Sequence, residues 1–164
     1  MPDSLTNVVI AGLGGQGVLT ASDILAQAAL RAGFDVKKSE IKGMSQRGGS
    51  VTSDVRFGRR VLSPMVPAGE ADYLLVLDAS QVECSRHYLA PGGKLILPTA
   101  VNPDQLPNKR SLNVALLGVL SAHLSLPEDC WLAALREGFR PEFFEGNRQA
   151  FLLGRTGPTP NPTA

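Results

Sequence analysis

The chain has 164 residues, which suits one domain with a substantial core, and its formal net charge is +1. No apolar run approaches the ~18 residues of a membrane span, and the N-terminus lacks the basic and apolar regions of a secretory signal. Together with a content of two cysteines, these features predict a cytoplasmic protein whose partners include neither a membrane nor a nucleic acid.

The first element is an apolar stretch with β-branched residues, Asn7–Leu13, which predicts a buried parallel strand. It runs into a turn in which Gly12, Gly14 and Gly17 have the G-x-G-x-x-G spacing, and an amphipathic helix follows over residues 16–32. Free backbone N–H groups at such a helix N-terminus favour an anion. A tight turn packed closely for steric reasons explains the same glycines equally well.

A dinucleotide-binding fold also requires a carboxylate at the tip of the second strand, where it binds the ribose hydroxyls. The second strand, predicted from Phe34 to Ile41, has Asp35 at its start and lysines at positions 37 and 38. These lysines fit a 2′-phosphate, although arginine is the more usual residue for that group. The pattern therefore argues against a simple NAD-binding protein.

A basic, glycine-containing loop over residues 37–50 follows, and alternating polarity then predicts a half-buried strand, Ser50–Phe57. Between positions 37 and 60 there are seven basic and two acidic residues, so this segment carries 7 − 2 = +5. Such charges either protect a sheet edge from pairing with another chain or bind an anionic ligand or an acidic partner. The loop glycines favour the ligand, because they let the backbone approach it closely. The candidate ligand-binding residues are Gly12, Gly14, Gly15, Gln16, Gly17, Lys38, Ser39, Gly43, Met44, Ser45, Gln46, Arg47, Gly48, Gly49 and Ser50.

The next residues, Gly58, Arg59 and Arg60, predict a turn into a short partner strand through Val61 and Leu62, which makes one antiparallel hairpin. The remaining elements are a buried strand, a helix, a Pro-Gly-Gly turn, a strand, a linker and three helices. They are expected at residues 73–78, 79–90, 91–93, 94–97, 98–110, 112–124, 127–138 and 141–153. Asp78 is expected to cap the helix that follows it.

The order of elements predicts a single α/β domain over residues 1–155, followed by a Pro-rich disordered tail, 156–164. We expect a mostly parallel, Rossmann-like sheet with one antiparallel hairpin, helices on both faces and a helical C-terminal part. The glycine turn and the basic loop both leave the carboxyl ends of strands, where open α/β sheets bind ligands. They are therefore expected to face one crevice.

No catalytic centre is recognisable from local motifs. Cys84 and Cys130 are far apart, and cannot by themselves hold a four-cysteine cluster or a structural zinc. The histidines, His87 and His123, have no adjacent motif, and no nucleophile elbow or zinc-binding helix is present. We predict neither catalytic residues nor a metal site on this chain.

Several unlinked motifs, taken together, resemble one protein family. They are Gly12–Val18, Lys-Lys-Ser-Glu (residues 37–40), Gly-Met-Ser-Gln-Arg-Gly-Gly-Ser-Val (43–51), Val-Arg-Phe-Gly (55–58), Tyr73–Asp78, Pro-Gly-Gly (91–93), Asn113–Gly118, and Asn147–Phe151 with Gly154. They cover nearly the whole chain in the right order. The sequence thereby resembles the gamma subunits or domains of 2-oxoacid:ferredoxin oxidoreductases, and most of all the small (beta) subunits that act with indolepyruvate.

The resemblance implies a companion subunit without activity of its own. In this family a larger chain carries thiamine diphosphate and iron–sulfur clusters, decarboxylates the 2-oxoacid and passes electrons to ferredoxin, while coenzyme A takes up the acyl group. The chain is then expected to bind no cofactor tightly, to place coenzyme A near the basic loop, and to meet ferredoxin only indirectly; a homodimer stays open. The alternatives are a free-standing nucleotide-binding module of the NAD(P) or coenzyme A type, and a purely structural interaction protein.

The sequence departs from the family pattern at two places. The segment between the strand at Leu95 and the helix at Asn113 is short, with only residues 98–110 to bridge it. Asp54 stands where the family often has histidine, which exchanges a cation for an anion beside the basic segment.

Overall fold

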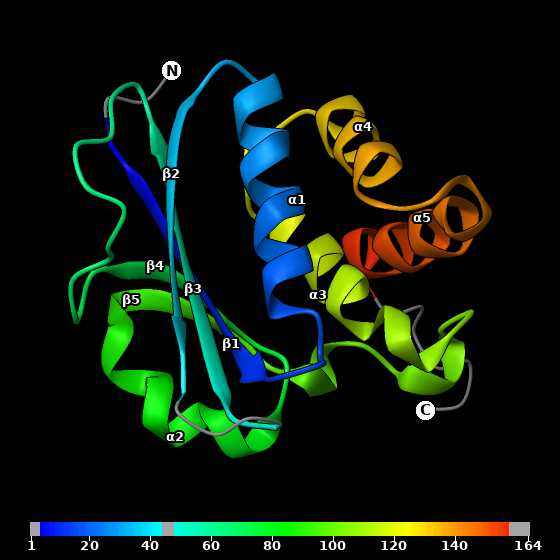
Figure 1. The fold of residues 1–164 in the computed structure, drawn as a ribbon, viewed down its shortest axis with the longest axis horizontal. Coiled ribbons are helices and arrows are strands. Elements are labelled where there is room, and N and C mark those ends of the chain that lie inside the picture. The colour runs from blue at the N-terminus through cyan, green and yellow to red at the C-terminus, as the bar shows by residue number, and fades with distance from the viewer. Residues whose placement is uncertain (1–3, 44–47, 158–164) are drawn as a thin grey trace.

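The computed structural model describes residues 4–43 and 48–157. Its five-stranded sheet consists of β1 (Thr6–Leu13), β2 (Asp35–Lys42), β3 (Ser50–Gly58), β4 (Ala71–Val76) and β5 (Leu89–Ile96), in the order β2-β3-β1-β4-β5 (Figure 1). β3 is antiparallel to both of its neighbours, and β4 is parallel to β1 and β5. Four strands therefore run in one direction, as the predicted mostly parallel α/β sheet requires.

Helices cover the two faces of the sheet unequally (Figure 1). The main core lies between one face and α1 (Val18–Arg31), α3 (Leu112–Ser121), α4 (Glu128–Gly138) and α5 (Pro141–Thr156). A smaller core on the other face is covered by the short α2 (Val82–Ser85) with its flanking 3-10 turns and by the loop after β3. β1 is buried on both faces, because Val8 and Ile10 face the main core and Val9 and Ala11 the smaller one.

The predicted pairing of β3 with a strand through Val61 and Leu62 is wrong. β3 instead forms the hairpin with β2, around residues 43–49, and its other edge pairs with β1 over its whole length. Since both edges of β3 are occupied, no edge is left for a third strand. The N–H of Val61 donates to the Asp35 carboxylate at 2.7 Å instead.

The helix predicted over residues 79–90 is broken. A 3-10 turn, Ala79–Gln81, precedes α2, another, Arg86–Tyr88, follows it, and β5 already begins at Leu89. The Ser85 hydroxyl donates to carbonyls of the preceding turn, a bond that weakens a helix interior. The expected Pro-Gly-Gly turn is an irregularity within β5, opposite the step from Ala71 to Tyr73.

The three C-terminal helices are confirmed, and the linker before them consists of short 3-10 turns at Pro98–Ala100, Pro103–Gln105 and Lys109–Ser111. α5 extends to Thr156, and the tail beyond residue 157 lies outside the described residues, so the expected domain boundary stays a prediction. Within the described ranges no helix is long and apolar enough to cross a membrane.

Candidate anion-binding site

The glycine turn between β1 and α1 uses two glycines in the left-handed region. Gly15 has φ +88° and Gly17, the N-cap of α1, has φ +84°. A Cβ on Gly17 would lie 2.3 Å from Asn113 Nδ2, whereas a Cβ on Gly15 would meet nothing within 4 Å. Gly17 is therefore required by both backbone and packing, and the surface over Gly15 is open to a ligand.

Gln16 stabilises this turn through two side-chain hydrogen bonds. Its Oε1 accepts from the Leu13 N–H at 2.8 Å, and its Nε2 donates to Asp78 Oδ2 at 2.7 Å. A Cβ on Gly12 would lie 3.1 Å from the same Oε1 and 2.9 Å from Val18, so a side chain there would collide with both. The structure thus gives Gly12 and Gln16 a role in shaping the turn.

Asp78 caps the segment after β4, as predicted from the sequence. Its Oδ1 accepts from the N–H of Ser80 at 3.0 Å and from the Ser80 hydroxyl at 2.6 Å. The Ser80 hydroxyl, the Gln16 amide and the Ser80 N–H hold the pKa of Asp78 below its ordinary value. Asp78 is thus an anion beneath the turn, and it orients Gln16.

The glycine turn and the basic loop meet at one cleft. The Gly14 N–H donates to the Gly49 carbonyl at 2.9 Å, and the Gly43 N–H to the Ser50 carbonyl at 2.7 Å, so both ends of the loop are fixed beside the turn. The cleft measures about 760 Å³. Its lining residues are Leu13, Gly14, Gly15, Gly17, Val18, Leu19, Thr20, Lys42, Gly43, Gly48, Gly49, Ser50 and Val51. The expectation that turn and loop share a crevice is confirmed.

The cleft has the chemistry to hold an anion. Val18, Leu19 and Thr20 form the first turn of the 14-residue α1, where backbone N–H groups have no acceptor within the helix. The partial positive charge of that helix end points at the cleft. Lys42, exposed at the end of β2, adds a full positive charge among the lining residues.

A second pocket of about 440 Å³ shares Gly15 with the cleft, and it is lined by a cationic pair that the sequence did not associate with the turn. Lys109 and Arg110, both exposed, line it together with Gln16, Leu77 and Asn113, among others. The sequence places them in the predicted linker, and their separation from the glycine turn by more than ninety residues hides the proximity. The one available signal was two adjacent cations directly before a helix N-terminus.

The remaining predicted ligand-binding residues divide into two groups. Met44, Ser45, Gln46 and Arg47 lie outside the described residues. Lys38 donates to Asp23 and to Ser22 Oγ, and its Nζ lies 2.9 Å from Glu40 Oε1. Ser39 lies in β2 opposite Asp54. Lys38 and Ser39 stay predictions, and Lys38 would have to exchange partners to bind a ligand.

Part of the positive charge predicted for the segment 37–60 is engaged internally. Burial lowers the pKa of Lys38, but its hydrogen bonds and ion pairs with Asp23 and Glu40 outweigh that effect and raise the pKa above its ordinary value. Arg56 donates to Asn7 Oδ1 and to the carbonyls of Ser63 and Met65. These two cations therefore stabilise the fold.

The described residues contain no group of three or more histidine, cysteine, aspartate or glutamate side chains that could hold a metal ion. Cys84 is exposed and Cys130 is half-buried, and both are free thiols. The groups that line the cleft and could attract an anion are backbone N–H groups and Lys42.

Comparison with known proteins identifies the family. The model of the pyruvate ferredoxin/flavodoxin oxidoreductase family matches residues 7–157. The chain belongs to this family. The subunit IorB of an indolepyruvate oxidoreductase from Thermococcus kodakarensis is 51% identical over 87 residues, which are 53% of this chain and 43% of that subunit. In this alignment the chain spans less than half the length of its relative.

Solved structures of oxidoreductases have the same fold. A 2-oxoglutarate:ferredoxin oxidoreductase from Magnetococcus marinus, with 2-oxoglutarate, coenzyme A and succinyl-CoA bound, aligns at a TM-score of 0.80 and 22% identity over 94% of this chain and 31% of that one. The gamma subunit of a keto/oxoacid ferredoxin oxidoreductase from Geobacter sulfurreducens aligns at 0.76 and 21% identity, and there the match covers 94% of this chain and 96% of that subunit. The family fold thus extends over nearly all of this chain.

Proposed function

We propose that this chain is the small, gamma-type subunit or domain of a 2-oxoacid:ferredoxin oxidoreductase and is active only together with a larger chain. The complex oxidatively decarboxylates a 2-oxoacid to carbon dioxide and the acyl-CoA, and two electrons pass to ferredoxin. Indolepyruvate or another arylpyruvate is the substrate class. Family membership supports the reaction, and the 51% identity to an indolepyruvate oxidoreductase subunit supports the substrate class.

The larger chain carries the thiamine diphosphate and the iron–sulfur clusters. Thiamine diphosphate supplies the decarboxylation chemistry when bound, and the clusters carry the electrons. The lack of a metal-binding group among the described residues, together with two separate thiols, supports placing the clusters elsewhere. This chain then contributes to the complex by binding a ligand and orienting it.

Coenzyme A is the ligand we assign to the cleft, and the observation that carries this assignment is the Gly14–Gly49 hydrogen bond, which joins turn and loop around it. The diphosphate and the 3′-phosphate of coenzyme A are anions that match backbone N–H groups and lysine. Gly15 lines both pockets, and a Cβ on it would meet nothing within 4 Å. A ligand with several phosphates that occupies both pockets across Gly15 would have Lys42 and Arg110 among the residues that line its site.

A free-standing NAD(P)-binding module is the second candidate, and the sheet order argues against it. In dinucleotide-binding folds the second strand lies directly beside the first, which brings its tip to the ribose. Here the antiparallel β3 lies between β1 and β2. The tip of β2 carries Lys42 and is displaced by one strand from the glycine turn.

The first test is anaerobic capture of the tagged chain from its native cells. We expect a larger chain to co-purify with iron and thiamine diphosphate, and the eluate to reduce a dye when an arylpyruvate and coenzyme A are added. Sedimentation of the eluate also establishes whether the chain self-associates. A captured chain without iron, which binds NAD or NADP in calorimetry, would overturn the subunit assignment.

The second test concerns the cleft. We expect Lys42→Ala and Arg110→Ala in the captured complex each to weaken coenzyme A binding about three- to tenfold, as loss of one charge-assisted contact predicts. Lys94→Ala is the matched control, because Lys94 is an exposed lysine on β5 and lines neither of these two pockets. Equal affinity for all three variants and the wild type would remove coenzyme A from the cleft.

A further inference from the structure

Residues 61–66, which we call the apolar loop, project a pair of large hydrophobic side chains into solvent. Leu62 is 79% exposed, more than any other large hydrophobic residue described, and Met65 is 55% exposed. Pro64 stands between them, and Leu62 and Met65 are separated by only three positions. Two large apolar side chains exposed within four residues of one loop make that loop a candidate contact surface.

The loop is held in place at both ends. Val61 and Val66 are 2% and 3% exposed, so a buried side chain anchors each end. Their N–H groups donate to carboxylates of the sheet, Val61 to Asp35 Oδ2 at 2.7 Å and Val66 to Asp54 Oδ2 at 2.9 Å. Leu62 and Met65 therefore lie on a short segment whose two ends are fixed to the sheet.

The middle of the loop is held as well. Arg56 Nη1 donates to the carbonyls of Ser63 and Met65, each at 3.0 Å, and its Nε donates to Asn7 Oδ1 at 2.9 Å. One guanidinium thus links the backbone beside Met65 to β1 and β3. A surface held this rigidly loses little conformational entropy when a partner covers it.

Fixing this loop to Asp54 lowers the stability of the fold, because it buries a carboxylate. Asp54 is only 3% exposed, and within the described part of the chain its Oδ1 accepts no hydrogen bond. Burial raises the pKa of Asp54, although the Val66 N–H and the charge of Arg56 oppose the shift. A connection that merely joined β3 to β4 would need no buried carboxylate, so the loop conformation itself is what Asp54 maintains.

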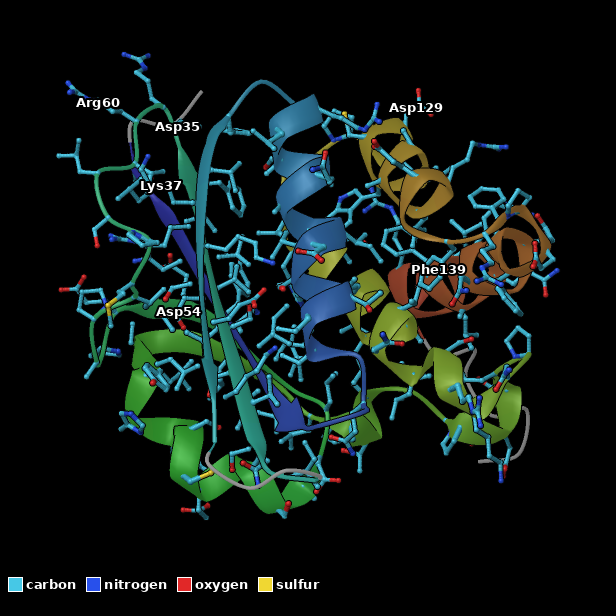
Figure 2. All side chains as sticks on the ribbon, viewed as in Figure 1. Asp35, Lys37, Asp54, Arg60, Asp129 and Phe139 are labelled. Atoms are coloured by element: carbon cyan, nitrogen blue, oxygen red, sulfur yellow. The ribbon has the colours of Figure 1, made fainter. Side chains whose placement is uncertain are left out.

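Arg60 and Lys37 bring positive charge to the surroundings of the loop. Residues 59–70 contain two arginines and one acid, Glu70. Figure 2 shows Arg60 and Lys37 on the same side of the sheet as this loop, and the Asp35 carboxylate beside them is engaged by Val61. Two copies of such a surface would repel each other, whereas a partner with acidic residues around an apolar pocket would be attracted.

We propose that the apolar loop is a preformed docking knob that inserts Leu62 and Met65 into an apolar, acid-rimmed pocket of the larger oxidoreductase subunit. The proposal rests on the proposed function only for the identity of that partner. Because β3 runs antiparallel to β1, the loop leaves β3 at the end of the sheet opposite the glycine cleft. Docking and ligand binding are therefore separable by mutation.

The test is the dissociation constant between this chain and the purified large subunit. We expect the double variant Leu62→Ser, Met65→Ser to bind at least tenfold more weakly while its melting temperature is unchanged, since both side chains are exposed. Phe143→Ser is the matched control, because Phe143 is 56% exposed but lies on α5. Arg60→Glu is expected to slow association at low salt and to change it little at high salt.

The outcomes separate the two proposals. Wild-type affinity of the double variant overturns the docking knob and leaves the subunit assignment intact. A wild-type chain that binds no thiamine diphosphate subunit overturns both. If the wild type dimerises and the double variant is monomeric, the occupant is a second copy, which also overturns the proposal as stated.

Discussion

Gln16 and Asp78, separated by 62 residues in the sequence, share a 2.7 Å hydrogen bond between Nε2 and Oδ2. Gln16 follows β1 and Asp78 follows β4, the parallel neighbour of β1. The chain leaves β1 toward the α1 face and leaves β4 toward the α2 face, so the bond lies where the connections diverge. Open α/β sheets bind ligands at such points, and here the bond supports the glycine turn from below.

Gln16→Glu is expected to weaken this support. A carboxylate at position 16 cannot donate to Asp78 when ionised and places a like charge beside it, so the pKa of Asp78 should move upward. We expect that shift in an NMR titration of the Asp78 carboxyl, together with weaker coenzyme A binding. Gln27→Glu, at an exposed site on α1, is the control. An unchanged Asp78 titration would show that the bond does not hold in solution.

Gly118→Ala is expected to destabilise the protein strongly. A Cβ on Gly118 would lie 2.0 Å from the carbonyl oxygen of Phe151, and one on Gly154 1.8 Å from that of Ala115. α3 and α5 must then move apart, and we expect a loss of about 3 kcal/mol or more. Gly146→Ala on α5, where a Cβ meets nothing within 4 Å, should instead stabilise by about 0.5–1 kcal/mol. Urea unfolding of the variants measures both, and equal stability of the Gly118 and Gly146 variants would refute the close helix contact.

Asp54 predicts a pH dependence of stability. Its pKa in the folded protein lies above the ordinary 3.8 because burial disfavours the charged form, so the folded state holds the proton more tightly than the unfolded chain. The resulting stabilisation is present below pH 3.8 and is lost as the pH rises through the raised folded-state pKa.

Asp54→Asn should remove that loss, because an amide oxygen still accepts from Val66 but carries no charge. Melting temperatures should be measured from below pH 3.8 upward for the wild type, Asp54→Asn and the exposed control Asp104→Asn. The dependence of melting temperature on pH should be flatter for the Asp54 variant alone. A wild-type melting temperature that does not fall as the pH rises above 3.8 would contradict the burial of the Asp54 charge.

Lys38→Met is expected to reduce stability by about 1 kcal/mol, because it removes ion pairs with Asp23 and Glu40 at a site where the lysine side chain is 22% exposed. The difference from the wild type should shrink at high salt. Lys37→Met, at the next position of β2, is the control. Lost coenzyme A affinity at unchanged stability would instead make Lys38 a ligand-binding residue.

Local patterns predicted the elements and the family. The apolar Asn7–Leu13 stretch, the alternation in Ser50–Phe57 and the C-terminal helical periodicity each correspond to observed elements, since the periodicity of burial follows directly from the sequence. The helix predicted over 79–90 failed because the Ser85 hydroxyl bonds locally to backbone carbonyls, and because β5, which pairs with β4, already begins at Leu89. The pairing of β3 failed because pairing partners depend on which edges remain free.

By itself, the sequence determined the α/β class, the glycine turn at a helix N-terminus and the family, because periodicity, the order of elements and the motifs are all read along the chain without knowing which segments touch. Only the tertiary structure decided that Lys109 and Arg110 flank the turn, that Lys38 and Arg56 are engaged internally, and that Asp54 holds an exposed apolar loop. Lys109 and Arg110 lie more than ninety residues from the turn, and the other contacts join a strand to a different helix, strand or loop. Their proximity is set by strand order and helix packing, which no local pattern records.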